Sequence, residues 1–224
     1  SYTWGQVEFF VIDDRWYRDP CEDPDTPEKT MLGAGQYEWL TTRLEASNAV
    51  FKVLVSGSGW SVNKGEGGDA WSAYLHERNR LFDFIRDREI SGVVLMSGDT
   101  HVGELNVIPW SDNGGYDLYD MVSSPLAQVI PDSWLERRPE RRIWPAYFQG
   151  SNFGLVDFTM GDDPMMSYRL VDTFGRVVRG PFEVKASELV NGVTSWPDKV
   201  EDVPRQRQEH YDAGDGYYEI PVED

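Results

Sequence analysis

Three short apolar runs divide the first half of the chain, at residues 7–12, 51–55 and 92–96. Runs of this length, rich in β-branched and aromatic side chains, are typical of strands buried on both faces of a layered α/β domain. Apolar residues at three- and four-residue spacings predict helices between the strands, over 36–46 and 69–88. The pattern therefore favours the α/β fold class.

The helix predicted over 69–88 is the strongest in the chain. Its apolar positions share one face, and its charged residues, including Glu77 and Arg78, fall on the other face, which we expect to meet solvent. Asp69 stands at the predicted start, where a carboxylate can cap the first backbone N–H groups.

The second half of the chain has the pattern of antiparallel sheet, in which short apolar runs alternate with Gly- and Asp-containing turns. After about residue 187 the apolar pattern fades into an acidic, polar segment. We therefore divide the chain into a domain over 1–185 and an acidic C-terminal extension over 186–224. The further strands are predicted at 104–109, 116–123, 153–158, 167–171 and 177–184.

The net charge of −18 over 224 residues limits the possible partners. Such a chain repels nucleic acid and anionic membranes, so we expect neither a nucleic-acid surface nor a membrane partner. It has no apolar run of 18 residues, and its start lacks the pattern of a signal peptide. If it handles a phosphorylated substrate, its site must be made locally positive by metal ions and a few arginines.

Two conspicuous features carry little chemistry. The single cysteine, Cys21, has acidic neighbours that raise rather than lower a thiol pKa, so we expect an inert thiol. The basic run over 136–142 is either a solvated loop or a phosphate clamp, and the first reading is the more usual for a charge run.

Asp99 and His101 are the candidate metal ligands. They follow the strand over 92–96 in a Gly-containing turn, so both side chains can be directed at one point beyond the sheet edge. A carboxylate and an imidazole form a ligand set for iron, manganese or zinc. Alternatively, Asp99 only caps the turn. Glu104 either orients the imidazole or is a solvent-facing strand residue. The other histidines, His76 and His210, lie on a helix and in the polar tail, where we expect no role.

Several separated stretches, in this order, resemble the alkaline phosphatase D (PhoD-like) family of the calcineurin-like metallophosphoesterases. The ordered set is far more specific than any one member. The resembling stretches lie at 11–19, 32–40, 51–53, 69–74 with 77–78, 95–101, 123–126 and 152–154.

The resemblance implies a four-layer αββα sandwich with mixed sheets, which hydrolyses phosphate esters by a metal-bound hydroxide. It also implies an exported enzyme, periplasmic or secreted, that uses two or more metal ions, iron and calcium among them. Asp99 and His101 match the last metal-binding motif of the family. Arg15 matches the arginine near bound phosphate, where it would neutralise charge on the phosphoryl oxygens.

The chain departs from the family pattern in two ways. It lacks the earlier Asp- and Asn-containing motifs, so residues 1–185 correspond to the C-terminal part of the catalytic domain, and the missing N-terminal half is a candidate partner. Glycine and serine stand at 56–60, where many relatives have a His-rich loop, which leaves a backbone contact to phosphate. The resemblance places Trp60, Asn63 and Asp69 at the rim of the site or at a helix cap.

Two other functions stay open. A degenerate homologue would keep the fold without turnover. A glycoside hydrolase would also be rich in tryptophan and carboxylates, although no pair of carboxylates is picked out here.

Overall fold

The structure is a computed structural model that describes residues 1–62, 68–127 and 141–201. Asn63, His210 and residues 136–140 of the basic run lie outside the described residues. Two α-helices, ten strands and short 3-10 helices are described. The helices are α1 (Gly33–Ala46), α2 (Leu75–Asp87), η1 (Trp71–Ala73), η2 (Trp110–Asn113), η4 (Ala186–Glu188) and η5 (Pro197–Lys199). The strands are β1 (Tyr2–Trp4), β2 (Val7–Val11), β3 (Phe51–Val55), β4 (Val93–Ser97), β5 (Glu104–Ile108), β6 (Leu118–Val122), β7 (Arg141–Arg142), β8 (Asn152–Thr159), β9 (Met165–Asp172) and β10 (Val177–Lys185).

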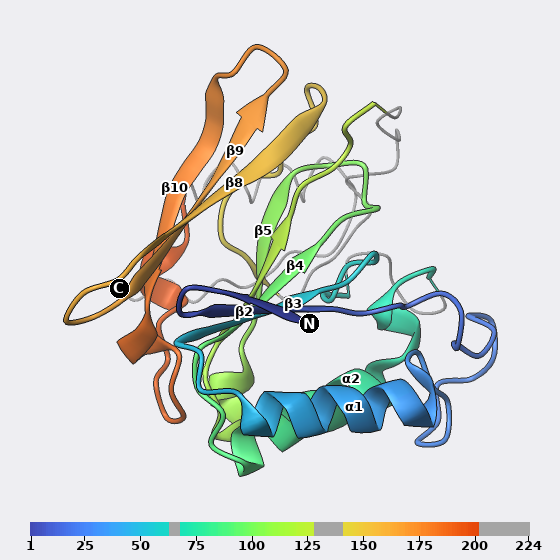
Figure 1. The fold of residues 1–224 in the computed structure, drawn as a ribbon. Helices are drawn as coiled ribbons and strands as arrows, with labels where there is room; N and C mark the ends of the chain where they lie inside the picture. Colours follow the sequence, from blue (N-terminus) through green and yellow to red (C-terminus); the bar gives the residue numbers. More distant parts are fainter. Residues whose placement is uncertain (63–67, 128–140, 202–224) are drawn as a thin grey trace, which may run out of the picture.

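A mixed seven-stranded sheet in the order β1-β2-β3-β4-β6-β5-β7 forms the centre of the molecule (Figure 1). Strands β2, β3, β4 and β6 run parallel, while β1, β5 and β7 are antiparallel to their neighbours. Parallel strands are covered on both faces, which explains why their sequences are almost entirely apolar. The three strands predicted in the first half of the chain are confirmed, as is the α/β fold class.

Helices α1 and α2 both lie on one face of this sheet (Figure 1). They bury Leu40 and Leu44 of α1 and Leu81, Phe82 and Ile85 of α2. Their apolar stripes are the ones that the helical spacing predicts.

The charged face of α2 departs from the prediction, because Glu77 and Arg78 are only 2% and 4% exposed. The carboxylate of Glu77 accepts hydrogen bonds from the backbone N–H groups of Met31 and Leu32, and Arg78 donates to the carbonyl oxygen of Trp60. The prediction that both side chains meet solvent is therefore wrong. They are buried because each satisfies backbone groups of a connecting segment.

The second half of the chain forms a separate antiparallel sheet in the order β10-β9-β8, as predicted. It packs against the larger sheet through ring contacts of Phe158 with Phe51 and of Phe182 with Tyr119. The predicted boundary at residues 185/186 stays a prediction. The described part of the extension contributes Leu189 to the core. No helix among the described residues is long and apolar enough to cross a membrane.

Candidate active site

The carboxyl ends of the four parallel strands meet at one edge of the sheet, and the loops that follow them form the candidate site. Three of these loops lie within contact distance of one another. A Cβ atom on Gly98 would lie 3.9 Å from the carbonyl oxygen of Ser123 and 4.0 Å from that of Gly57. Gly98 follows β4, Ser123 follows β6 and Gly57 follows β3. Open α/β sheets bind ligands at such an edge, so the structure brings the predicted loops together.

Asp99 and His101 are held in an uncommon backbone conformation. Their φ angles are 65° and 61°, in the left-handed region that residues other than glycine rarely adopt. Thr100 between them is fully buried, and the backbone N–H of His101 donates to the hydroxyl of Ser124 at 3.1 Å. Strain of this kind persists where the surrounding structure imposes it, and it gathers at functional sites. The geometry of this turn therefore supports a functional role for both residues.

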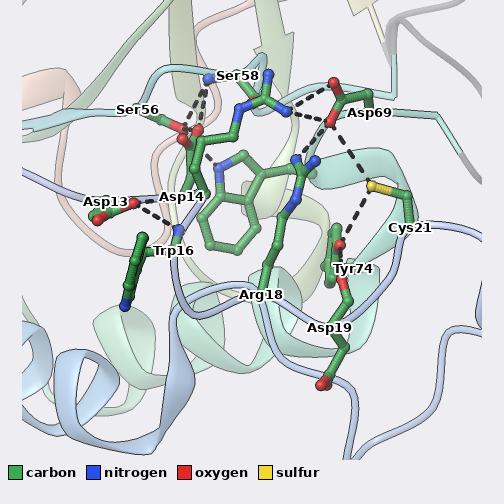
Figure 2. A network of polar contacts seen from close by, with 12 residues as sticks. Asp13, Asp14, Trp16, Arg18, Asp19, Cys21, Ser56, Ser58, Asp69 and Tyr74 are labelled. Atoms are coloured by element: carbon green, nitrogen blue, oxygen red, sulfur yellow. Dashed lines mark hydrogen bonds and ion pairs between the residues drawn. The ribbon is translucent and has the colours of Figure 1, made fainter.

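Asp14 is a buried carboxylate at the same edge that the sequence analysis did not select. Its Oδ2 accepts hydrogen bonds from the Ser56 hydroxyl and from the backbone N–H of Ser58, each at 2.7 Å (Figure 2). A side chain on Gly57 would lie 3.0 Å from Asp14 Oδ1, so any residue larger than glycine would press on this carboxylate. The sequence does contain a signal for Asp14, because the acidic pair Asp13-Asp14 directly follows the apolar run over 7–12.

A second buried carboxylate, Asp120 of β6, holds the rest of the loop after β3. It accepts hydrogen bonds from the backbone N–H groups of Trp60 and Ser61 at 3.0 and 3.2 Å, and from the Ser97 hydroxyl at 2.7 Å. The backbone N–H groups of Ser58, Trp60 and Ser61 in this loop therefore bind carboxylates of the chain. The glycines at 56–60 suggested that the backbone N–H groups of this loop bind phosphate. The carboxylates of Asp14 and Asp120 compete with phosphate for these N–H groups. Trp60 is fully buried and stacks on Trp71, so its predicted place at the rim is wrong.

Asp120 makes the stability of the fold depend on pH. Burial raises the pKa of Asp120 from its usual 3.8 to about 6, although the hydrogen bonds from Ser97, Ser61 and Trp60 oppose the rise. Between about pH 4 and pH 6 the folded state holds a proton that the unfolded state has released, so stability falls as the pH rises through this window. We expect the loss to be on the order of 3 kcal/mol.

The Asp120→Asn variant should lack this part of the pH dependence, because an amide does not titrate. Urea unfolding of both proteins at intervals from pH 4 to pH 7 gives the difference in unfolding free energy at each pH. Asp157→Asn, at an exposed position of β8, is the control. A difference between wild type and Asp120→Asn that is constant with pH would contradict the expectation.

Arg15 lies at the same edge, in the loop that follows β2. Its guanidinium donates from Nη1 to both carboxylate oxygens of Asp69 at 2.8 Å. The pKa of Arg15 is raised chiefly by this hydrogen bond and further by the charges of Asp69, Asp99 and Asp14. The structure therefore places the predicted phosphate-binding arginine within electrostatic reach of the candidate ligand Asp99.

The prediction that Asp69 caps a helix is wrong. Helix α2 begins at Leu75, and no side chain caps either α2 or the preceding η1. Asp69 instead forms ion pairs with Arg15 and Arg18. Two guanidinium groups compete for its oxygens more strongly than a helix N-terminus does, because each bond joins opposite full charges.

The pKa values show the effect of this pairing. Burial alone would raise the pKa of Asp69, but hydrogen bonds and charges from both arginines outweigh it and lower the value to about 2. Cys21 also contacts this carboxylate, with its Sγ at 3.7 Å from Asp69 Oδ1 (Figure 2).

Glu104 is fully buried, so the reading of a solvent-facing strand residue is wrong. Its Oε1 pairs with Nη2 of Arg142 at 3.0 Å, and its Oε2 accepts from the amide of Asn106 at 3.1 Å. Arg142 belongs to the basic run and is only 4% exposed, so this member of the run is not a solvated loop residue. The two partners are 38 positions apart in the sequence, so the local pattern around either residue does not predict the pair.

The donor set of the site fits a metal ion in kind but not in number. Asp99 and His101 supply carboxylate and imidazole, but the described residues contain no group of three or more His, Cys, Asp or Glu side chains that could hold a cation. Residues 1–62, 68–127 and 141–201 therefore do not complete a metal site by themselves. His76 lies on α2, as predicted, where it is exposed and lines a cavity of about 740 Å³ with Tyr37 and Arg80.

Comparisons with known proteins show the family of the chain. The model of the PhoD-like phosphatase family matches residues 1–138. Alkaline phosphatase D of Bacillus subtilis (strain 168) is 29% identical over 143 residues, which cover 56% of this chain and 23% of that protein. A solved structure described as "Structure of PhoD" has 18% sequence identity and a TM-score of 0.57, over 95% of this chain and 48% of the solved one. The chain thus spans less than half the length of these relatives. Because the family model covers more than half of its residues, the chain belongs to the PhoD-like phosphatase family.

Proposed function

We propose that the chain supplies part of the active site of a metal-dependent enzyme that hydrolyses phosphate esters. The observation that carries this proposal is the turn after β4, where Asp99 and His101 are both held at positive φ and where the charge of Asp99 acts on Arg15. The two residues on either side of Thr100 are both held in this uncommon conformation, and such conformations gather at functional sites. Membership of a phosphatase family supports hydrolysis and speaks against a glycoside hydrolase.

Asp99 and His101 would serve as two ligands of a metal ion, and the resemblance implies iron and calcium. Such a cation supplies positive charge for the phosphoryl oxygens and a nucleophile at neutral pH. The remaining ligands would come from outside the described residues, in a four-layer αββα sandwich of which this chain forms one part. The proposal of a periplasmic or secreted location rests on the resemblance alone.

Arg15 would bind the phosphoryl group directly. Its side chain is 49% exposed, and only its Nη1 takes part in the side-chain hydrogen bonds found within the described residues. A guanidinium has five N–H donors in a planar fork that matches two phosphate oxygens. Arg15 can therefore keep its bonds to Asp69 and still donate to a substrate.

An inactive homologue that keeps the fold is the second candidate function. It is favoured by the absence of a third metal-binding side chain beside Asp99 and His101 within the described part of the chain. Such a protein would bind phosphate through Arg15 without turnover.

Hydrolysis of p-nitrophenyl phosphate and of bis-p-nitrophenyl phosphate distinguishes the two. Both esters should be assayed with this chain and with a protein extended to the length of the relatives, with iron and calcium supplied and again with chelator. We expect hydrolysis by the extended protein that the chelator abolishes. Inactivity of both proteins with metals supplied would contradict the enzyme and leave the inactive homologue.

A further inference from the structure

Asp69 joins two arginines of one loop to a distant part of the chain. Arg15 and Arg18 lie in the loop that follows β2, while Asp69 precedes η1, more than 50 positions later. Both oxygens of Asp69 accept from Arg15, and Oδ1 also accepts from Nη1 of Arg18. Figure 2 shows Arg18 and Asp69 close together. The carboxylate therefore holds two guanidinium groups in one fixed arrangement.

This cluster of Arg15, Arg18 and Asp69 carries a net positive charge. Two guanidinium groups and one ionised carboxylate sum to +1, because arginine stays protonated and the pKa of Asp69 is lowered to about 2. The chain as a whole carries −18. The charges of Asp14 and Asp99 also act on Arg15. The two arginines therefore supply positive charge at an edge that several carboxylates share, and an acidic protein needs such charge to attract a phosphate group.

Arg18 also has N–H donors that make no hydrogen bond to the described residues. Within the described residues, the side-chain hydrogen bonds of Arg18 involve only its Nη1, and 18% of its side chain is exposed. The Nε and Nη2 groups of both arginines therefore make no hydrogen bond to the described residues, and part of each side chain is exposed to a ligand. One tetrahedral phosphate has enough oxygens to accept from two guanidinium groups at once.

We propose that Arg18 is a second arginine that binds the phosphoryl group, and that Asp69 is a positioning residue that aligns Arg15 and Arg18 for it. This inference rests on the proposed function and adds two residues to its phosphate-binding site. Free arginine side chains lose rotamer entropy when they order on a ligand. Asp69 removes that cost in advance, because it fixes both guanidinium groups before the substrate arrives.

The Arg18→Gln variant tests the first part. Affinity for inorganic phosphate is measured by isothermal titration calorimetry in the wild type and the variant. The values of kcat and KM for p-nitrophenyl phosphate are measured in the extended protein, supplied with iron and calcium, with and without the same substitution. Loss of a charge-assisted hydrogen bond should weaken phosphate binding about 10- to 100-fold. Arg18→Lys keeps the charge without the fork and should give a smaller loss, and its thermal unfolding midpoint shows that the fold is intact.

The Asp69→Asn variant tests the second part, because two accounts predict opposite signs. If the carboxylate only lowers the local charge, its neutralisation raises the net charge of the cluster from +1 to +2 and tightens phosphate binding. If Asp69 aligns the arginines, phosphate binds about 10-fold more weakly and kcat/KM falls by a similar factor. Asp69→Glu should recover part of the loss. Asp157→Asn removes an exposed carboxylate paired with Arg169 on the other sheet and should change neither quantity.

The outcomes separate this inference from the proposed function. If the wild type binds phosphate and Arg18→Gln and Arg18→Lys bind it equally well, Arg18 has no role, although the enzyme stands. Tighter binding by Asp69→Asn overturns the positioning role. If the wild type and the extended protein neither bind phosphate nor hydrolyse the ester, the proposed function fails and this inference fails with it.

Discussion

Replacing Asp99 by asparagine should lower the rate of p-nitrophenyl phosphate hydrolysis by the active protein at least 100-fold. Residues that merely orient a metal ligand already cost about 10- to 100-fold when they are removed, and loss of the ligand itself should cost no less. Asparagine tolerates the φ of 65° at this position and has nearly the same volume, so the fold should stay intact. The measurement is kcat/KM at saturating iron and calcium, with the thermal unfolding midpoint recorded beside it.

Glycine at either strained position should separate activity from stability. His101→Gly relieves a backbone conformation that costs about 1–2 kcal/mol, and glycine itself costs about 0.5–1 kcal/mol in flexibility. We therefore expect an unfolding free energy that is unchanged or up to about 1 kcal/mol higher, with activity lost. Glu89, after α2, has a φ of 53°, and Glu89→Gly is the matched control. Glu89→Gly should show the same effect on stability with full activity.

For the Asp99→Asn variant, a rate of hydrolysis within a few-fold of wild type would show that Asp99 is not a metal ligand of the site.

The second large effect is on stability. Arg142→Met should lower the free energy of unfolding by about 3–5 kcal/mol, because it leaves the carboxylate of Glu104 buried and without its opposite charge. Urea unfolding at neutral pH measures the change. Arg169→Met breaks an exposed ion pair with Asp157 and should cost less than about 1 kcal/mol.

A double variant tests whether the unpaired carboxylate of Glu104 causes the loss of stability in Arg142→Met. Glu104→Leu combined with Arg142→Met removes both charges, so it should recover most of the stability that Arg142→Met alone loses. If Arg142→Met loses less than about 1 kcal/mol of unfolding free energy, or the double variant recovers none of the loss, the pair does not stabilise the contact between β5 and β7.

Apolar runs were enough to predict the strands that build the site, because burial on both faces leaves a nearly continuous apolar sequence. Their common edge followed from the parallel order, which the pairing of Leu54 with Leu95 shows. The burial of Glu77 could not be predicted, since its partners Met31 and Leu32 lie about 45 positions away. Helical periodicity assigns a charged residue to the solvent side unless a distant backbone group needs it.

The candidate site was predictable to a similar extent. Asp99 and His101 stood out because they follow a buried strand, but no residue type reveals a φ of 65° or 61° in advance. Asp69 resembled a helix cap because caps are local, whereas its ion pairs with Arg15 and Arg18 form only when two loops meet. Polar residues whose partners are remote in sequence are therefore the ones that pattern alone places wrongly.

A crystal structure of the protein extended to the length of its relatives, grown with iron, calcium and phosphate, tests the central claim most directly. Anomalous scattering locates the iron. We predict an iron ion with a carboxylate oxygen of Asp99 and an imidazole nitrogen of His101 at about 2.0–2.2 Å, the range for such ligands in metal sites. A phosphate oxygen should accept a hydrogen bond from Arg15. Iron bound elsewhere, with the Asp99 and His101 side chains directed apart, would contradict the account.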